Sequence, residues 1–333
     1  MTSVSGHGRT FRQAGVALLT AMLTVTLVAT FAAAAMWQQW RGVEVEAAER
    51  ARVQSGWILT GALDWARLIL REDARAGDAD HLSEPWAVPL KDVRLSSFLS
   101  TDKNADNSDR EAFLSGQIID LQSRLNVTNL IDGNVISESG VSSFSRLFET
   151  LGLPPAELTL LTGNMLRASQ SGNQAGQAGA VQTSARDPGV PFMPERVGEL
   201  LWLGLTAESL NLLAPHITLL PTRTPVNVNT AGAEVLYAVT AGMAMADAQK
   251  LVTARQRNHF RALSDAVRIS AGRPDLFNEN LHTVSSRFFE VRGSLRLDEI
   301  TLQERSLIQR DGLTVRTLWR SRTVASDSRA SVS

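Results

Sequence analysis

Residues 9–41 read RTFRQAGVALLTAMLTVTLVATFAAAAMWQQWR, and no charged side chain occurs between Arg12 and Arg41. In a helix that rises about 1.5 Å per residue, the apolar run 16–37 spans roughly the 30 Å hydrocarbon layer of a bilayer. A secretory signal has a shorter apolar core with small residues after it, whereas here the small pair Ala-Gly at 14–15 stands before it. The stretch therefore predicts a helix that anchors the chain in a membrane.

Charges on either side of the apolar run predict its orientation. Arg9 and Arg12 precede the run, and three glutamates follow it, namely Glu44, Glu46 and Glu49. Because basic residues favour the cytoplasmic side, we expect the first residues in the cytoplasm and the bulk of the chain outside. Apolar residues then recur at helical spacing as far as Ile69 without an intervening proline, so one helix from about 16 to 71 is predicted.

The composition limits the class of protein. With 333 residues, 44% of them hydrophobic, the chain can bury a sizeable core, and a net charge of -1 provides no global basic field for nucleic acid. The absence of cysteine excludes disulfides, thiolate nucleophiles and cysteine metal sites. The five histidines show no metal-ligand spacing and no serine lies in a nucleophile elbow, so the sequence predicts no enzyme.

Beyond the first helix, strand and helix patterns follow one another. Segment 116–131 mixes β-branched and apolar residues as strands do, and a meander closes the chain, with strands at 281–298, 299–310 and 313–324 and an Asp-Gly hairpin turn. Helical spacing lies between them, in 141–153, 155–169, 195–213, 231–241, 245–257 and 262–270. Residues 169–190 are rich in Gly, Gln, Ala and Ser, which predicts a mobile surface loop. We therefore predict an α+β fold with an inserted helical block.

Several ordered motifs carry a resemblance to a known family. They are Gly15-Val16 before the apolar run, SGWILTGALDWARLIL (55–70), EPWAVPL (84–90), SGQIIDLQSRLNVTNL (115–130) and PVNVNTAGAEVL (225–236). With them the chain resembles minor pseudopilin K of type II secretion, from Gly15 to roughly Thr323. The resemblance implies a pilin-like long N-terminal helix packed on an antiparallel sheet, with a large α-helical insertion that contains a helix-hairpin-helix-like segment.

The resemblance also implies boundaries along the chain. A prepilin leader peptide would occupy 1–15, and the N-terminal pilin helix 16–72, of which 16–37 is transmembrane. Segments 73–137 and 281–324 would form the pilin-like α+β domain, 138–280 the inserted α-helical domain, and 325–333 a flexible tail.

In that family a prepilin peptidase cuts after the glycine and methylates the new N-terminus, which implies processing between Gly15 and Val16. Most pilins carry Glu at mature position five, whereas this position is Thr20 here; the K subunits share this lack of Glu. A carboxylate in lipid is costly unless it is paired, so a subunit with no neighbour ahead of it gains by this replacement. Thr20 therefore suits a subunit at the tip of a fibre.

The resemblance further implies a place and partners for the chain. It would be a single-pass protein of the bacterial inner membrane, with its bulk in the periplasm, and would form the tip of the periplasmic pseudopilus and so support secretion across the outer membrane. The implied partners are the other minor pseudopilins (the I, J and H subunits), the major pseudopilin, the prepilin peptidase and the inner-membrane secretion platform.

Segment 226–266 is similar to a helix-hairpin-helix module, with Gly242-Met243-Ala244 as the hairpin. In nucleic-acid binders of this type, hairpin amides approach a phosphate, and basic residues do follow here, at Lys250, Arg255, Arg257 and Arg261. A membrane-anchored nucleic-acid-binding protein is therefore the alternative function. We prefer a packing module and expect no nucleic acid, because the second hairpin glycine is replaced and the net charge is low.

Polar residues in the motifs are expected to have structural roles. Asp120 and Asn126 should fix turns beside the first strand, and Asn229 or Thr230 should cap a helix. Asn129, Asn227 and Gly242 complete this set of motif residues.

A calcium site is a further hypothesis. Asp102, Asn104 and Asp106 match the first half of an EF-hand loop, but the loop lacks Gly at its sixth place and has Phe113 where the bidentate Glu belongs. Members of the resembling family bind calcium through an acidic segment of the helical insert, which here is the non-acidic LRASQSGNQAGQAGA. No cofactor is certain from the sequence, and calcium stays open.

Overall fold

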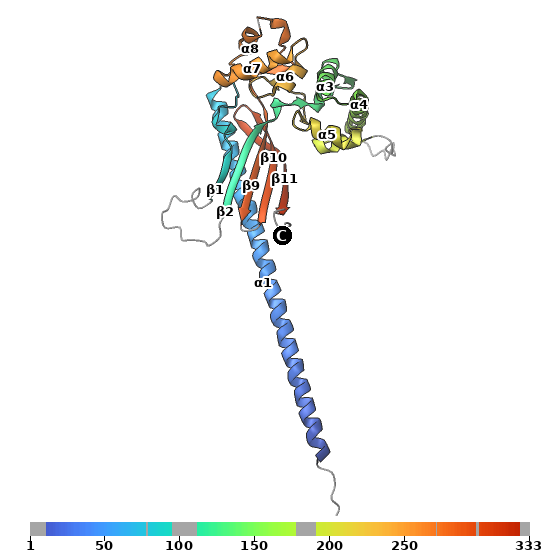
Figure 1. Cartoon of the computed structure of the whole chain (residues 1–333), viewed down its shortest axis with the longest axis vertical. Helices are drawn as coiled ribbons and strands as arrows, with labels where there is room; N and C mark the ends of the chain where they lie inside the picture. Colours follow the sequence, from blue (N-terminus) through green and yellow to red (C-terminus); the bar gives the residue numbers. More distant parts are fainter. Residues whose placement is uncertain are drawn as a thin grey trace, which may run out of the picture. The chain divides into compact units, whose positions relative to one another are not determined.

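The computed structural model describes residues 11–77, 79–94, 112–177, 191–270, 272–297 and 300–326 (Figure 1). The chain divides into two compact units, Met1–Ile58 and Leu59–Ser333, and each is described by itself. Helix α1 (Phe11–Ala76) has 66 residues and belongs to both units. The predicted helix from 16 to 71 is confirmed and continues five residues further.

A five-stranded antiparallel sheet organises the second unit. Its strand order is β1 (Leu90–Arg94), β2 (Ala112–Asp120), β9 (Phe288–Leu297), β10 (Ile300–Asp311) and β11 (Thr314–Ser326). The predicted meander is confirmed, but its first strand begins at residue 288 and not at 281, because residues 282–283 form a separate short strand outside this sheet. Gly312 in the β10–β11 turn has a φ of 55°, a left-handed conformation that suits glycine. The sheet places β1, which follows α1, at one edge and β11, the last strand, at the other (Figure 1).

The prediction of one strand over 116–131 is wrong after Asp120. The chain instead forms the 3-10 turns η2 (Leu121–Ser123) and η3 (Val127–Leu130), separated by the short strand β3 (Leu125–Asn126). The cause lies in two side chains, because Asp120 accepts a hydrogen bond from the backbone N–H of Gln122 and Asn126 accepts one from that of Thr128. Such bonds compete with a strand ladder and favour turns.

The C-terminal part of α1 covers one face of the sheet. Leu63, Ala66 and Leu70 form one buried cluster with side chains of the sheet and of η1 (Pro85–Ala87), namely Trp86, Phe289, Val291, Ile308 and Val315. Gly293 faces this helix, since a Cβ atom at Gly293 would lie 3.2 Å from Cδ2 of Leu59. Glycine at this position therefore lets the helix approach the sheet closely.

The helical block follows between β2 and β9. Its α-helices are α3 (Glu138–Leu151), α4 (Pro155–Gln177), α5 (Ala207–Leu213), α6 (Ala233–Val239), α7 (Met245–Arg257) and α8 (Leu263–Ile269), and its 3-10 helices are η4 (Val197–Leu203) and η5 (Pro274–Leu276). Short strand pairs join its ends: β3 with β6 (Ile217–Thr218), β4 (Ile131–Asp132) with β5 (Val135–Ile136), and β7 (Val226–Asn227) with β8 (His282–Thr283).

Two predicted boundaries in this block differ from the structure. The predicted loop from 169 begins too early, because α4 continues to Gln177. The predicted helix 195–213 is divided at Gly204, whose φ of 105° ends η4 before α5 begins. Alanine, serine and glutamine are compatible with a helix, and a glycine in a left-handed conformation ends one, so both differences follow from local chemistry.

The helical block has its own hydrophobic core. It includes Phe144, Leu147, Met165 and Leu200, none of them more than 1% exposed, and it begins at Leu125, ahead of residue 138. A smaller cluster of Leu121, Leu220, Phe288 and Leu307 connects the block with the sheet face opposite α1. The domain boundaries given above stay a prediction.

Candidate functional site

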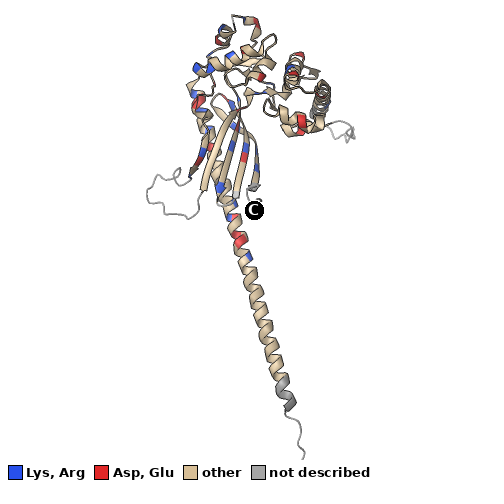
Figure 2. Cartoon of the chain, viewed as in Figure 1, with Lys and Arg blue, Asp and Glu red and all other residues tan. Residues whose placement is uncertain are grey.

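The first candidate site is the apolar part of α1. This helix contains an 18-residue window of mean hydropathy 2.2, none of it buried, and by length and composition it can cross a membrane. In Figure 2 the corresponding stretch of helix is free of the colours that mark charged residues. Such a helix fits a single-pass membrane anchor.

The residues predicted for processing and assembly lie on this helix. Gly15 and Val16 are inside α1, which begins at Phe11, and the Val16 side chain is 62% exposed. The hydroxyl of Thr20 donates to the carbonyl oxygens of Val16 and Ala17, both at 3.0 Å. Because backbone carbonyl oxygens of the helix accept this hydrogen bond, the free energy of placing Thr20 in lipid is far lower than that of placing a carboxylate there.

The second candidate site is a buried polar cluster at the end of β2. Asp120 is 3% exposed, and its Oδ2 atom accepts hydrogen bonds from Thr230 Oγ1 (2.6 Å), Ser286 Oγ (2.7 Å) and Asn227 Nδ2 (3.2 Å). Three of the sequence motif residues, Asp120, Asn227 and Thr230, therefore come together although Asp120 is more than 100 positions from the other two. Sequence reasoning missed Ser286.

Arg310 extends this cluster to α1. Its guanidinium lies 2.6 Å from Asp73 Oδ2 and 2.5 Å from Asp80 Oδ1, donates to the carbonyl oxygen of Ser286 at 2.9 Å, and lies 4.8 Å from the Phe289 ring centroid. Asn227 Nδ2 also contacts the carbonyl oxygen of Asp80, at 3.2 Å. The cluster thus connects α1, the sheet and β7 of the helical block. No local motif marks Arg310 or its two aspartates.

Three carboxylates of this region could in principle hold a metal ion. Oxygen atoms of Asp73, Asp80 and Glu84 lie within 4.8 Å of one another. However, Arg310 already binds the two aspartates, and Oε2 of Glu84 accepts from the backbone N–H of His81 (2.8 Å) and from Trp86 Nε1 (2.7 Å). The arrangement is therefore an internal ion-pair network. The predicted calcium ligands Asp102, Asn104 and Asp106 lie outside the described residues.

Burial perturbs the carboxyl groups of this network. It raises the pKa of Asp80 to about 6 against the opposing effect of Arg310, and it raises the pKa of Glu84 to about 7, with Asp73 adding to the increase. Burial also raises the pKa of Asp120, although its hydrogen bonds oppose the change. The physical reason is that loss of hydration disfavours the charged form of each carboxyl group more than its hydrogen bonds, and Arg310 in the case of Asp80, favour it.

Replacing Glu84 with Gln should flatten the pH dependence of thermal stability. An acid with a raised folded-state pKa stabilises the fold fully below its unfolded pKa and loses that contribution as pH rises through the folded pKa. For Glu84 this window runs from 4.5 to about 7. In melts of the full chain in detergent, wild type should therefore lose more stability than Glu84→Gln as the pH increases across this window.

Other titratable groups also change the stability in part of this pH window, and they are the same in wild type and in Glu84→Gln. Burial lowers the pKa of His282 to about 4, so its contribution is lost as pH falls below 6.5, opposite in sign to that of Glu84. This effect cancels in the difference between wild type and variant. The exposed Glu279→Gln is the control and should leave the slope unchanged. Equal slopes for wild type and Glu84→Gln would contradict the assignment.

The remaining motif residues tie segments of the block together. Asn126 donates to the carbonyl oxygen of Thr222 at 2.8 Å, and Asn129 exchanges hydrogen bonds with the backbone of Thr224 at 2.8 and 3.0 Å. Asn229 exchanges two bonds of 2.9 Å with the backbone of Phe260. The prediction that Asn229 or Thr230 caps a helix is wrong, because α6 begins after Gly232.

The segment similar to a helix-hairpin-helix consists of α6, a hairpin and α7. Gly242 has a φ of 76° in the hairpin, and its carbonyl oxygen accepts from Arg273 Nη2 at 2.8 Å. Arg255 is buried, donates to the carbonyl oxygen of Val228 at 2.7 Å, and burial lowers its pKa to about 10. Lys250 pairs with Asp247 at 2.9 Å. Two of the four predicted cations are thus engaged within the protein, which favours the packing module.

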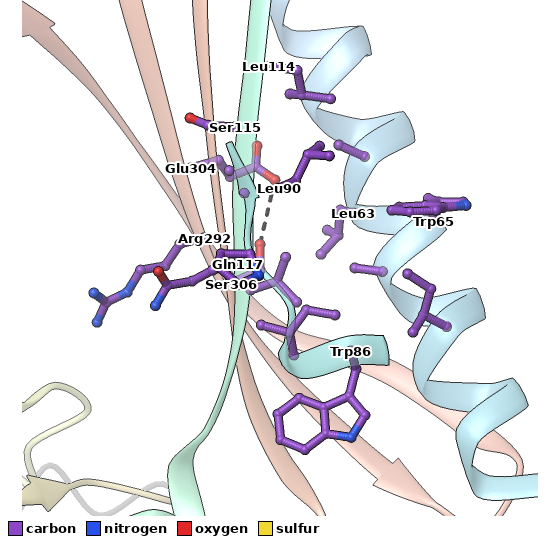
Figure 3. Close-up of a pocket in the computed structure, with 18 of the residues that line it drawn as sticks. Leu63, Trp65, Trp86, Leu90, Leu114, Ser115, Gln117, Arg292, Glu304 and Ser306 are labelled. Carbon is purple, nitrogen blue, oxygen red and sulfur yellow. Dashed lines mark hydrogen bonds between the residues drawn. The ribbon is translucent and has the colours of Figure 1, made fainter. Parts of the chain in front are cut away.

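An apolar groove lies between α1 and the β1–β2 edge of the sheet (Figure 3). Its volume is about 260 Å³, and Leu63, Trp65, Leu90 and Leu114 contribute apolar side chains. The carboxylate of Glu304 lies in its lining with Ser306 and is paired with arginines of β11. The groove can therefore accommodate apolar groups.

Comparisons with known proteins agree with this architecture. Two family models described as type II secretion system protein K match residues 123–222 and 226–285. Type II secretion system protein K of Pseudomonas aeruginosa is 27% identical over 88% of this chain and 86% of its own length, and that of Klebsiella pneumoniae is 27% identical over 91% and 94%.

A solved structure has the same fold. A chain in the crystal structure of the GspK-GspI-GspJ complex from the type 2 secretion system of enterotoxigenic Escherichia coli matches with a TM-score of 0.62 and 19% identity, over 83% of this chain and 98% of that one. The match covers a fold with a long N-terminal helix, an antiparallel sheet and a helical block. By sequence this chain is similar to type II secretion system protein K over most of its length, and by fold it is similar to a chain of the GspK-GspI-GspJ complex.

Proposed function

We propose that this chain is the minor pseudopilin that forms the tip of a periplasmic pseudopilus in type II secretion. The observation that carries the proposal is that one helix, α1, contains both an apolar exposed segment and a segment that packs on the sheet. Its residues 16–37 are apolar and exposed, as a membrane anchor requires, and its residues from Leu59 onward pack on an antiparallel sheet. A subunit stored in a membrane and assembled into a fibre needs both properties in one helix.

The location and the role follow from this proposal. The anchor lies in the inner membrane with the N-terminus in the cytoplasm, as the arginines before it favour, and the sheet and helical block lie in the periplasm. The chain acts as a structural and interaction protein and not as an enzyme. The bulk of the helical block and the lack of a carboxylate at Thr20 both oppose addition of a further subunit ahead of this one.

The proposed direct partners are the I and J subunits. The Escherichia coli relative was crystallised in a complex with GspI and GspJ, which supports the same partners here. Partnership with the H subunit, the major pseudopilin, the prepilin peptidase and the inner-membrane platform completes the proposal. Nucleic acid is not among the proposed ligands, because Arg255 and Lys250 already have partners within the fold. Calcium at 102–106 remains a proposal without structural support.

Processing tests the proposed function. When the full chain is expressed with a prepilin peptidase, we expect the intact mass to fall by residues 1–15 and to rise by one methyl group, with Val16 as the mature N-terminus. Gly15→Leu should keep the full-length mass, because it replaces the glycine after which the peptidase is expected to cut, whereas the neighbouring control Ala14→Ser should be cut. An uncut wild-type chain would leave a plain membrane anchor and would refute the pseudopilin assignment.

A further inference from the structure

The outer edge of β11 carries backbone groups that are paired by no other strand in the described part of the chain. Among the described residues, β11 is the last strand of the sheet and pairs with β10 alone. It has 13 residues and contains neither proline nor lysine, the two residues that commonly protect edge strands. An unprotected edge of this length is a liability in a monomer, and the two halves of β11 differ in how they are protected.

The half of β11 nearest the hairpin is protected. Arg67 of α1 donates two hydrogen bonds, of 2.9 and 3.2 Å, to the carbonyl oxygen of Val315. The register then shifts between Leu307 and Ile308 of β10, which leaves Leu318 as a bulge. A bulge disturbs the edge and opposes strand addition.

The other half is regular. From Leu307↔Trp319 to Ile300↔Ser326 the pairing has no further irregularity. The backbone N–H of Arg310 donates to the carbonyl oxygen of Arg287, which lies on the β9 side. The backbone N–H and C=O groups of even-numbered β10 residues therefore point toward β9. Hydrogen-bonded and non-hydrogen-bonded pairs alternate in an antiparallel ladder, so these even-numbered residues form non-hydrogen-bonded pairs with β11. Their partners in β11 therefore direct their backbone N–H and C=O groups away from the sheet. These outward residues are Arg320, Arg322 and Val324.

The charge of the side chains on β11 determines which kind of partner strand this edge can bind. Residues 314–326 contain Arg316, Arg320 and Arg322 and no acid. The carboxylates that compensate them are Glu304, shared by Arg320 and Arg322, and Asp311, shared by Arg316 and Arg287. In the regular half of β11, Arg320 and Arg322 thus share the single carboxylate of Glu304, and this part of the edge retains a positive charge.

We propose that the edge of β11 from Arg320 to Val324 binds an extended acidic segment of the I or the J subunit, which adds to the sheet as a sixth strand. Main-chain hydrogen bonds to the outward N–H and C=O groups hold such a strand, and acidic side chains on it compensate the arginines. The inference rests on the proposed function, because it takes the partner from the same fibre. The exposed Val324, at 63%, lies within this edge and offers a site for substitution.

Proline at position 324 is the sharpest test. Its ring removes an outward donor that β10 does not use, so the sheet keeps its own ladder while strand addition is blocked. With full-length chain in detergent and purified I and J subunits of the same secretion system, Val324→Pro should raise the Kd at least about tenfold. The control Val324→Thr keeps the N–H and should stay within about twofold of wild type.

Amide hydrogen exchange on the wild-type chain provides a second measurement that needs no variant. The amides of residues 320, 322 and 324 should exchange fast in the free chain and become protected when I or J binds, and rising salt should weaken that binding. Binding of I and J without this protection would overturn the edge proposal and leave the proposed function intact. Failure of both subunits to bind would overturn both, and binding that is insensitive to salt would overturn the acidic partner.

Discussion

Replacing Arg310 with Met should lower the free energy of unfolding by about 3–5 kcal/mol at neutral pH, the typical cost of removing one partner of a buried ion pair. The Arg310 side chain is 9% exposed and the Asp80 side chain 2% exposed, so neither can recover much hydration after the change. The variant also loses the bond to the Ser286 carbonyl oxygen. Denaturant unfolding of the full chain in detergent, followed by tryptophan fluorescence, measures the loss, since Trp86 packs on Phe289 in the adjacent core.

Two further variants separate charge from packing. Asp73→Asn keeps the pair of Arg310 with Asp80 and should cost less than Arg310→Met. The double variant Arg310→Met with Asp80→Asn removes the uncompensated carboxylate and should recover part of the loss. Acid should have the same effect, because protonation of Asp80 removes the charge that Arg310 no longer neutralises. A loss below about 1 kcal/mol for Arg310→Met, as for a surface ion pair, would contradict the role assigned to this cluster.

The sequence predicted those elements whose signals are local. The apolar run 16–37, the Asp-Gly turn of β10–β11 and helix α7 are found where the pattern placed them. Each depends on neighbouring residues, either through helical spacing or through turn chemistry. Predicted helix ends are less accurate where a single residue determines the end of the helix. Gly204 is an example, because its left-handed backbone conformation is known only from the folded chain.

The polar cluster shows what local signals cannot provide. The sequence motifs include Asp120, Asn227 and Thr230, but local chemistry predicts only a turn at Asp120 and a helix cap at Thr230. In the structure Asp120 does cap η2, yet it also binds Thr230 from 110 positions away. Arg310 reaches Asp73 across 237 positions. Such pairings depend on how the sheet closes, which no spacing within one segment encodes.

Replacing Gly140 with Ala should destabilise the helical block strongly, although Ala is the better helix former. A Cβ atom at this position of α3 would lie 2.2 Å from the carbonyl oxygen and 2.9 Å from the carbonyl carbon of Asn129. These are backbone atoms held in place, since Asn129 is bonded to Thr224 and the carbonyl oxygen of Leu130 accepts from Ser137 N at 2.9 Å. Relieving the clash must shift α3 against η3, for which we expect a loss of about 3 kcal/mol in denaturant unfolding.

Gly163 in the middle of α4 provides the matched control for this prediction. Nothing lies within 4 Å of a Cβ atom there, so Gly163→Ala should leave stability unchanged or increase it by up to about 1 kcal/mol through helix propensity. Opposite signs for the two substitutions would show that the close approach of α3 to η3, and not helix propensity, requires glycine at 140. If Gly140→Ala were as stable as Gly163→Ala, α3 could not approach Asn129 as closely as described, and the geometry of this part of the core would be wrong.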